Sequence, residues 1–165
     1  MPDSTDAVPD SIPDVTDPSD RGASRVIRVS ALVLRRGDAM LMVRKRGTTA
    51  YMLPGGKPEP GEAPIDTIIR EVDEELDLTL EHGDLEELGT FEAPAANEAG
   101  HRVIGDVFLH RGMPEGFDFD GIRPQAEIDS VAWFLPDSLP EDSAALTIAP
   151  LTRVRVVPAL ARRSG

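Results

Sequence analysis

The sequence predicts an α/β fold in which a mixed β-sheet is flanked by helices. Two observations support this prediction. Short segments rich in β-branched and aliphatic residues recur along the chain, separated by glycine and proline turns, which is typical of strands. One segment between them, from Ala63 onward, instead repeats its apolar residues with a helical period. The 165 residues are enough for one domain with a substantial core.

The first 23 residues are expected to form a disordered acidic tail ahead of a single domain that spans residues 24–165. Residues 1–20 carry six Asp and no Lys, Arg or Glu, and they are rich in Pro and Ser. Such a composition cannot bury enough apolar surface to fold. The tail carries six of the 13 net negative charges, which leaves −7 on the rest. This acidity argues against nucleic-acid binding, which needs a basic surface.

The strands are expected in pairs and short runs. Two longer strands, Arg25–Arg36 and Ala39–Arg46, flank a turn at Gly37-Asp38 and form a hairpin. The remaining strands are expected near these ranges: Tyr51–Leu53, Leu85–Phe91, Val103–Leu109 and Val131–Leu135. After Ala149 the chain is expected to be helical, in stretches bounded by Pro150 and Pro158.

The helix expected from Ala63 onward is amphipathic and carries a cluster of glutamates. Its apolar stripe has members at i, i+3, i+4, i+7 and i+11, which are Ile65, Ile68, Ile69, Val72 and Leu76. Glu71, Glu74 and Glu75 lie away from this stripe and neighbour one another on the helix. Like charges at this spacing cost about 0.2–0.5 kcal/mol per pair, and the helix dipole disfavours anions near the C-terminus. A bound divalent cation would turn this repulsion into attraction.

Other residues close to this helix suit a metal site. The loop Leu53-Pro54-Gly55-Gly56 precedes the helix, and its glycines let the backbone approach a ligand closely. Glu62 lies just ahead of the helix, and Arg70 is placed to orient the carboxylates. Ligation by oxygen alone favours Mg²⁺ or Mn²⁺, and Mg²⁺ usually shares its remaining positions with water and substrate phosphate. The competing interpretation is a solvated acidic face.

The segment Gly56–Leu78 resembles the Nudix box of the Nudix hydrolases, which include the MutT-type nucleotide pyrophosphohydrolases. The matching positions are Gly56, Glu62, Arg70, Glu71, Val72, Glu74, Glu75 and Leu78. The chain departs from the box at Asp77, where the family has Gly. That Gly suits a left-handed position after the helix, and Asp tolerates this conformation better than most residues do. The resemblance implies the α/β/α sandwich of the Nudix fold, with the box forming a loop–helix–loop metal site.

The resemblance also implies an activity and a set of metal ligands. Nudix hydrolases use Mg²⁺ to cleave the pyrophosphate bond of a nucleoside diphosphate linked to another group. At the matching positions, Glu71, Glu74 and Glu75 are expected to ligate the ion. The Gly55 carbonyl is expected to be a further ligand, and Glu62 is expected to support the cluster through water or a second ion.

The catalytic roles that the resemblance implies are less uniform within the family. Arg70 is expected to orient the glutamates rather than to contact the substrate. Relatives draw the general base either from the box or from a later loop, so Glu74 and Glu71 come first and Glu127 next. An exposed loop acid is the alternative interpretation of Glu127.

Expected substrate contacts come from Lys57 and Arg44 with phosphates and from Tyr51 with a base. Solvation of the charged residues and packing of the tyrosine are the alternatives. A nucleoside triphosphate of MutT type is the first prediction for the substrate. ADP-ribose is the alternative, because its hydrolases often carry a proline at about the offset of Pro94. A non-catalytic nucleotide sensor is a second alternative, although such domains commonly lose box glutamates that this chain keeps.

The rest of the sequence gives expectations about the location and the partners of the protein. It has no cysteine, so it offers no disulfide framework and no zinc–thiolate site. No apolar run approaches the ~18 residues of a membrane helix, and no secretory signal is visible. A cytoplasmic enzyme acting on a small nucleotide is therefore expected, without nucleic-acid or membrane partners. Since relatives are often dimers, a homodimer is the assembly that the resemblance suggests. A calcium-binding protein is disfavoured because no twelve-residue Ca²⁺ loop is present.

Overall fold

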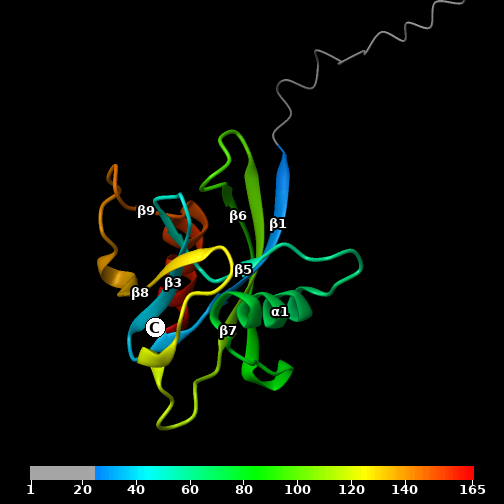
Figure 1. Cartoon of the computed structure of the whole chain (residues 1–165). Helices are drawn as coiled ribbons and strands as arrows, with labels where there is room; N and C mark the ends of the chain where they lie inside the picture. The colour runs from blue at the N-terminus through cyan, green and yellow to red at the C-terminus, as the bar shows by residue number, and fades with distance from the viewer. Residues whose placement is uncertain (1–24) are drawn as a thin grey trace, which may run out of the picture.

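The computed structural model describes residues 25–165, which form two mixed β-sheets covered by helices (Figure 1). The tail predicted for residues 1–23 lies outside the described residues. Within the described part of the chain, no helix is long and apolar enough to cross a membrane.

The first sheet includes the two glycines of the glycine loop as its edge strand. Its order is β5 (Gly55–Gly56), β1 (Val26–Val33), β7 (Arg102–His110) and β6 (Leu85–Pro94). Strands β1 and β7 run parallel, whereas β5 runs antiparallel to β1 and β6 runs antiparallel to β7. The short β5 pairs Gly55 with Ala31 and Gly56 with Ser30, so the glycine loop is fixed to the sheet.

The second sheet is built around one central hairpin strand. Its order is β2 (Arg35–Arg36), β3 (Ala39–Lys45), β4 (Ala50–Met52) and β9 (Thr147–Ile148), and β8 (Ile128–Phe134) pairs antiparallel with β3 along almost its whole length. The expected strand Arg25–Arg36 is interrupted at Leu34. Residues before this point pair with β5 and β7, and residues after it pair with β3, so the chain passes from one sheet to the other there.

Two apolar cores lie on opposite faces of the sheets, because side chains alternate along a strand. Leu32 and Leu41 pack with helix α1 (Pro64–Leu76). Ala31 and Met40, next to them in sequence, pack instead with the C-terminal helical segment. In Figure 1, α1 (green) and this segment (red) lie on different sides of the strands. The helix–sheet–helix layering confirms the predicted α/β/α fold.

The C-terminal helical segment differs from the prediction in its form. It begins with a π-helix, η5 (Leu151–Val156), and continues without a break into α2 (Val157–Arg163). Pro158 was expected to bound a helical stretch, but it lies in the first turn of α2. Proline lacks the N–H that a regular helix would use. The wider π turn before it, in which Val157 N–H donates to the Thr152 carbonyl, lets the chain stay helical across Pro158.

Helix α1 ends as the sequence predicts. Asp77 adopts the left-handed conformation (φ 54°, ψ 39°), and its N–H donates to the Asp73 carbonyl. A residue with a Cβ is less stable than glycine in this conformation. The aspartate at this position of the box is therefore a local cost in stability and not a change in the chemistry of the glutamates.

Replacing Asp77 by Gly is expected to stabilise the protein by about 0.5–1 kcal/mol, because glycine adopts this conformation without the Cβ penalty. Urea unfolding of the two proteins measures the difference, and hydrolytic activity should be unchanged. Asp77→Ala is the matched control and should be less stable than the natural protein. A Gly variant that is no more stable than the Asp protein would contradict this account of the helix end.

Candidate active site

The glycine loop touches both the first sheet and helix α1, so neither glycine tolerates a side chain. Gly55 has φ +151°, and a Cβ built on it would lie 1.9 Å from the Ser30 carbonyl oxygen. A Cβ on Gly56 would lie 2.3 Å from the carboxylate carbon of Glu71. The absence of both side chains brings the Glu71 carboxylate against the loop backbone, and this contact forms one wall of the site.

Glu75 is the buried member of the glutamate cluster, with 2% of its surface exposed. Its Oε2 accepts a hydrogen bond from the Gly55 N–H at 3.1 Å. Its Oε1 is also buried and has no hydrogen-bond partner among the described residues. Burial, and after it the nearby Glu71 charge, raise the pKa of this carboxyl to about 8, although the Gly55 hydrogen bond acts in the opposite direction. A buried oxygen without a partner is costly, and a cation would satisfy it.

Arg70 joins the other acidic residues of the cluster. Its guanidinium contacts Glu62 through both carboxylate oxygens (2.8 and 2.9 Å). It also contacts Glu71 at 2.9 Å and Glu74 at 3.5 Å, and it donates to the Lys57 carbonyl at 3.0 Å. The contact with Glu62 is bidentate, a geometry that the guanidinium of arginine provides and the amine of lysine does not. Arg70 therefore connects the segment before α1 with the glutamates of the helix.

The hydrogen bonds of Arg70 hold the Glu62 pKa at about 2, well below its ordinary value. The Glu59 N–H and the Thr67 hydroxyl also donate to the same carboxylate. Glu62 is therefore ionised and held in place at neutral pH. Its position just before α1 is set by this network.

The donor set fits a hard divalent cation. The side chain of Glu71 is 15% exposed, that of Glu74 is 53% exposed, and both lie on the same helix as the buried Glu75. The side-chain atoms available here as metal ligands are all carboxylate oxygens, which Mg²⁺ prefers. Among residues 25–165, no three acidic or histidine side chains yet converge on one point. Binding an ion would therefore require side-chain rotations that bring the carboxylates of this cluster closer together.

The loop before β8 brings Glu127 to the same site. Ala126 has a positive φ of 52°, which is uncommon for a residue with a side chain and is often found at functional sites. The Glu127 carboxylate pairs with Lys45 at 3.1 Å, and its backbone carbonyl accepts from the Arg46 N–H. This loop is also tied to α1, because the Gln125 N–H donates to the Glu75 carbonyl at 2.8 Å.

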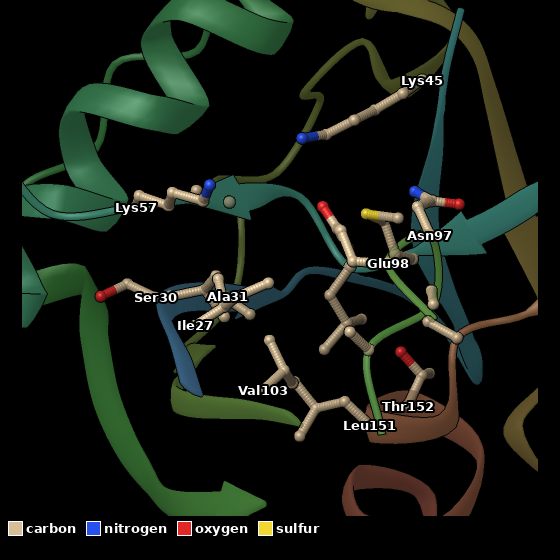
Figure 2. A pocket seen from close by; sticks show the side chains of 18 of the residues that line it. Ile27, Ser30, Ala31, Lys45, Lys57, Asn97, Glu98, Val103, Leu151 and Thr152 are labelled. Carbon is tan, nitrogen blue, oxygen red and sulfur yellow. The ribbon is translucent and has the colours of Figure 1, made fainter. Parts of the chain in front are cut away.

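A cavity of about 360 Å³ opens beside the glutamates (Figure 2). One end is lined by Gly56, Glu71 and Glu127, together with Lys45 and Lys57. The other walls are mainly aliphatic, and they include Ile27, Val29, Val103 and Leu151. In Figure 2 the two lysines lie on one side of the cavity, and Val103, Leu151 and Thr152 lie on the opposite side. The cavity therefore has a charged end beside the glutamates, and its other walls are mainly aliphatic but also include Asn97 and Glu98.

The three predicted substrate residues are placed differently. Lys57 lines the cavity, whereas Arg44 and Tyr51 are not part of its lining. Arg44 pairs with Asp129 at 3.2 Å and lies over the Tyr51 ring. Tyr51 is buried, and its hydroxyl is 2.7 Å from that of Ser130. Tyr51 therefore packs in the core, which is the alternative interpretation given above, and does not line the cavity.

The sequence did not identify the residues that close the far end of the cavity. Asn97 and Glu98 come from the loop between β6 and β7, and Leu151 and Thr152 come from the start of η5. These segments are far from the box in sequence. The one signal in them was Pro94, which lies in the cavity lining.

Comparison with known proteins identifies the family of this fold and site. The model of the NUDIX domain family matches residues 24–154. Over 109 residues the chain is 24% identical to a Bacillus subtilis protein named "Putative 8-oxo-dGTP diphosphatase", a match that covers 66% of each chain. It is 30% identical over 73 residues to the 8-oxo-dGTP diphosphatase of Escherichia coli, which covers 41% of this chain and 57% of the relative.

A solved structure shows the same fold. The MutT NUDIX hydrolase from Burkholderia pseudomallei superposes with a TM-score of 0.57 at 22% identity, over 75% of this chain and 92% of the other. The two curated relatives are matched over less than two thirds of their own length. The residues that the family model matches, 24–154, include the glutamates, the glycine loop and all of the residues that line the cavity.

Proposed function

The chain belongs to the Nudix hydrolase family, and from this membership we propose that it cleaves the pyrophosphate bond of a nucleoside triphosphate with the help of Mg²⁺. The observation that carries this proposal is the two-ended cavity beside the glutamates. Its charged end combines carboxylates for a cation with two lysines, and its other walls are mainly aliphatic, with Asn97 and Glu98 among them. A nucleotide has the matching form, with anionic phosphates at one end and an uncharged base at the other.

The residues of the charged end would have separate roles in hydrolysis. Glu71, Glu74 and Glu75, with the Gly55 carbonyl, would hold the cation, and Glu62 would support them. Bound Mg²⁺ would supply neutralisation of phosphoryl oxygens and activation of a water.

The side chains around this carboxylate set would orient the substrate and accept a proton. Arg70 would keep the carboxylates oriented, and Lys57 would contact a phosphate. Glu74 or Glu71 would accept the proton of the attacking water, with Glu127 as the next candidate. Lys45 pairs with the Glu127 carboxylate at 3.1 Å, and both residues line the cavity.

The triphosphate is supported by the names of the relatives. Both curated relatives are named as 8-oxo-dGTP diphosphatases, one of them as putative. The cavity volume of about 360 Å³ lies within the roughly 300–1,000 Å³ that small-molecule sites span. Pro94 in the cavity lining favours ADP-ribose as the second candidate substrate.

The test is hydrolysis of a nucleotide panel with and without Mg²⁺, read as phosphate release before and after a phosphatase is added. The panel holds the four dNTPs, 8-oxo-dGTP, ADP-ribose, NADH and a dinucleoside polyphosphate. We expect Mg²⁺-dependent turnover of a triphosphate, with a nucleoside monophosphate as product. Faster turnover of ADP-ribose would select the second candidate. Tight binding of a nucleotide without turnover would overturn the proposed hydrolytic activity and would indicate a nucleotide sensor.

A further inference from the structure

We propose that Thr67 is a positioning residue of the cation site. Its buried hydroxyl fixes the carboxylate of Glu62, and Glu62 in turn fixes the guanidinium of Arg70, which contacts the glutamates of the helix. This inference rests on the proposed function, because it concerns the geometry of the same site. Thr67 is not one of the positions that match the Nudix box. It also does not line the cavity, so it acts through its neighbours rather than on the substrate.

Thr67 lies near the start of helix α1 on its buried side, and none of its surface is exposed. Its hydroxyl oxygen lies 3.0 Å from Oε2 of Glu62 and 3.1 Å from the carbonyl oxygen of Ala63. A buried hydroxyl is normally hydrogen-bonded. Since a hydroxyl has a single proton to donate, these two acceptors compete for it.

The carboxylate of Glu62 is the stronger of the two acceptors. Threonines inside helices often donate to the carbonyl four residues earlier, and the contact with Ala63 is of this ordinary kind. That carbonyl, however, already accepts the backbone N–H of Thr67 at 3.0 Å. Glu62 forms a salt bridge with Arg70, and a hydrogen bond to an ionised carboxylate is roughly twice as strong as one between neutral groups. The hydroxyl proton is therefore donated to Glu62.

The position of Thr67 on the helix explains why this hydrogen bond matters for the site. Members of the charged cluster follow Thr67 at i+3, i+4 and i+7 and therefore share its face of α1; they are Arg70, Glu71 and Glu74. Glu62 precedes the helix and is not part of it. The bond from Thr67 therefore ties Glu62 to the helix face that carries the cluster.

Thr67 provides the most deeply buried contact of the Glu62 carboxylate. The Glu59 N–H donates to Oε2 at 2.8 Å from an exposed residue, and Arg70 donates to both oxygens at 2.8 and 2.9 Å. A β-branched side chain in a helix has few rotamers, so the hydroxyl of Thr67 is a fixed point for the carboxylate. Without this hydroxyl, Glu62 and the guanidinium are free to shift together. Such a shift would loosen the contact of Arg70 with Glu71 at 2.9 Å.

The test compares Thr67→Val with Thr67→Ser. Valine keeps the shape and removes the hydroxyl, whereas serine keeps the hydroxyl and loses a buried methyl group. At the same Mg²⁺ concentration, Thr67→Val should lower kcat about 10-fold with little change in the KM for the nucleotide, as expected when an outer partner of metal ligands is lost. Thr67→Ser should retain most of the activity, although the lost methyl group lowers its melting temperature. Activity that falls in step with the melting temperature in both variants would indicate a merely structural role and would overturn the inference.

A double-mutant cycle measures whether Thr67 acts through Glu62. In the background of Glu62→Ala, the further change Thr67→Val should alter kcat by less than about 2-fold, because the carboxylate that the hydroxyl holds is already absent. An equal loss in both backgrounds would overturn the inference. The matched control is Thr90→Val, which removes the hydrogen bond from a threonine hydroxyl to Asp106 at 2.6 Å on β6, outside the cavity lining. This control should keep the natural kcat.

A readout that needs no turnover separates this inference from the proposed function. The melting temperature as a function of Mg²⁺ concentration gives the concentration at which stabilisation is half-maximal. This concentration should rise about 10-fold in Thr67→Val and stay near the natural value in Thr67→Ser and Thr90→Val. If the natural protein hydrolyses no nucleotide but is stabilised by Mg²⁺, the proposed function fails while this comparison still tests Thr67. An unchanged Mg²⁺ dependence in Thr67→Val, or no effect of Mg²⁺ on the natural protein, would overturn the assignment of Thr67.

Discussion

Replacing Glu75 by Gln is expected to abolish Mg²⁺-dependent hydrolysis while leaving the protein folded. We expect kcat to fall on the order of 10²-fold or more, because a buried ligand of the cation would be lost. The amide should fit the same space, since its carbonyl oxygen can still accept from the Gly55 N–H that now donates to Oε2 at 3.1 Å. A neutral amide is also cheaper to bury than a carboxylate, and 98% of Glu75 is removed from solvent.

Two measurements together identify the role of Glu75. The first is kcat as a function of Mg²⁺ concentration for the natural protein and for Glu75→Gln. The second is the melting temperature with and without Mg²⁺, because an ion that binds the folded state raises it by mass action. Mg²⁺ should stabilise the natural protein and have little effect on Glu75→Gln.

The matched control is Asp73→Asn, which removes one negative charge from an exposed position of the same helix. It should keep both the activity and the stabilisation by Mg²⁺. If Asp73→Asn lost as much as Glu75→Gln, the net charge of the helix would explain the result. Full Mg²⁺-dependent activity in Glu75→Gln would remove Glu75 from the metal site altogether.

The sequence was enough to place helix α1 and its glutamates because the signal there is local. The apolar stripe that includes Ile68 and Val72 is buried as its period predicts. Asp77 adopts the left-handed conformation that its place in the box suggested. What the pattern could not give is the burial of Glu75 relative to Glu74, because this depends on Gly55 and on the Gln125 loop, which come from elsewhere in the chain.

The parts of the fold that the sequence missed depend on long-range pairing. Strand β9 is two residues long and is defined by its pairing with β4, so it has no periodic signal of its own. The break at Leu34 reflects a change of pairing partner rather than a turn residue. The far end of the cavity also depends on long-range contacts, since Val103 and Thr152 line it from segments almost 50 residues apart. A residue pattern within one segment does not predict which distant segment it will contact.

Replacing Arg70 is expected to disorder the glutamates and to lower both activity and stability. The guanidinium touches three carboxylates, of Glu62, Glu71 and Glu74, which would otherwise repel one another. Arg70→Gln should therefore lower kcat/KM on the order of 10²-fold through misplacement of the ligands. Arg70→Lys keeps the charge but not the two-point contact with Glu62, so it should recover only part of the loss.

The pH dependence of stability tests whether Arg70 acts through Glu62. Because Arg70 holds the Glu62 pKa at about 2, against 4.5 ordinarily, ionised Glu62 stabilises the fold above pH 4.5, and this contribution is lost as the pH falls toward 2. Arg70→Gln loses the largest part of this contribution, and only the hydrogen bonds from the Glu59 N–H and the Thr67 hydroxyl remain. The difference in melting temperature between the natural protein and Arg70→Gln, measured without metal, should therefore be largest near neutral pH and should narrow below pH 4.5. A constant difference would mean that Arg70 stabilises α1 by packing alone, and the loss of activity would then need another cause.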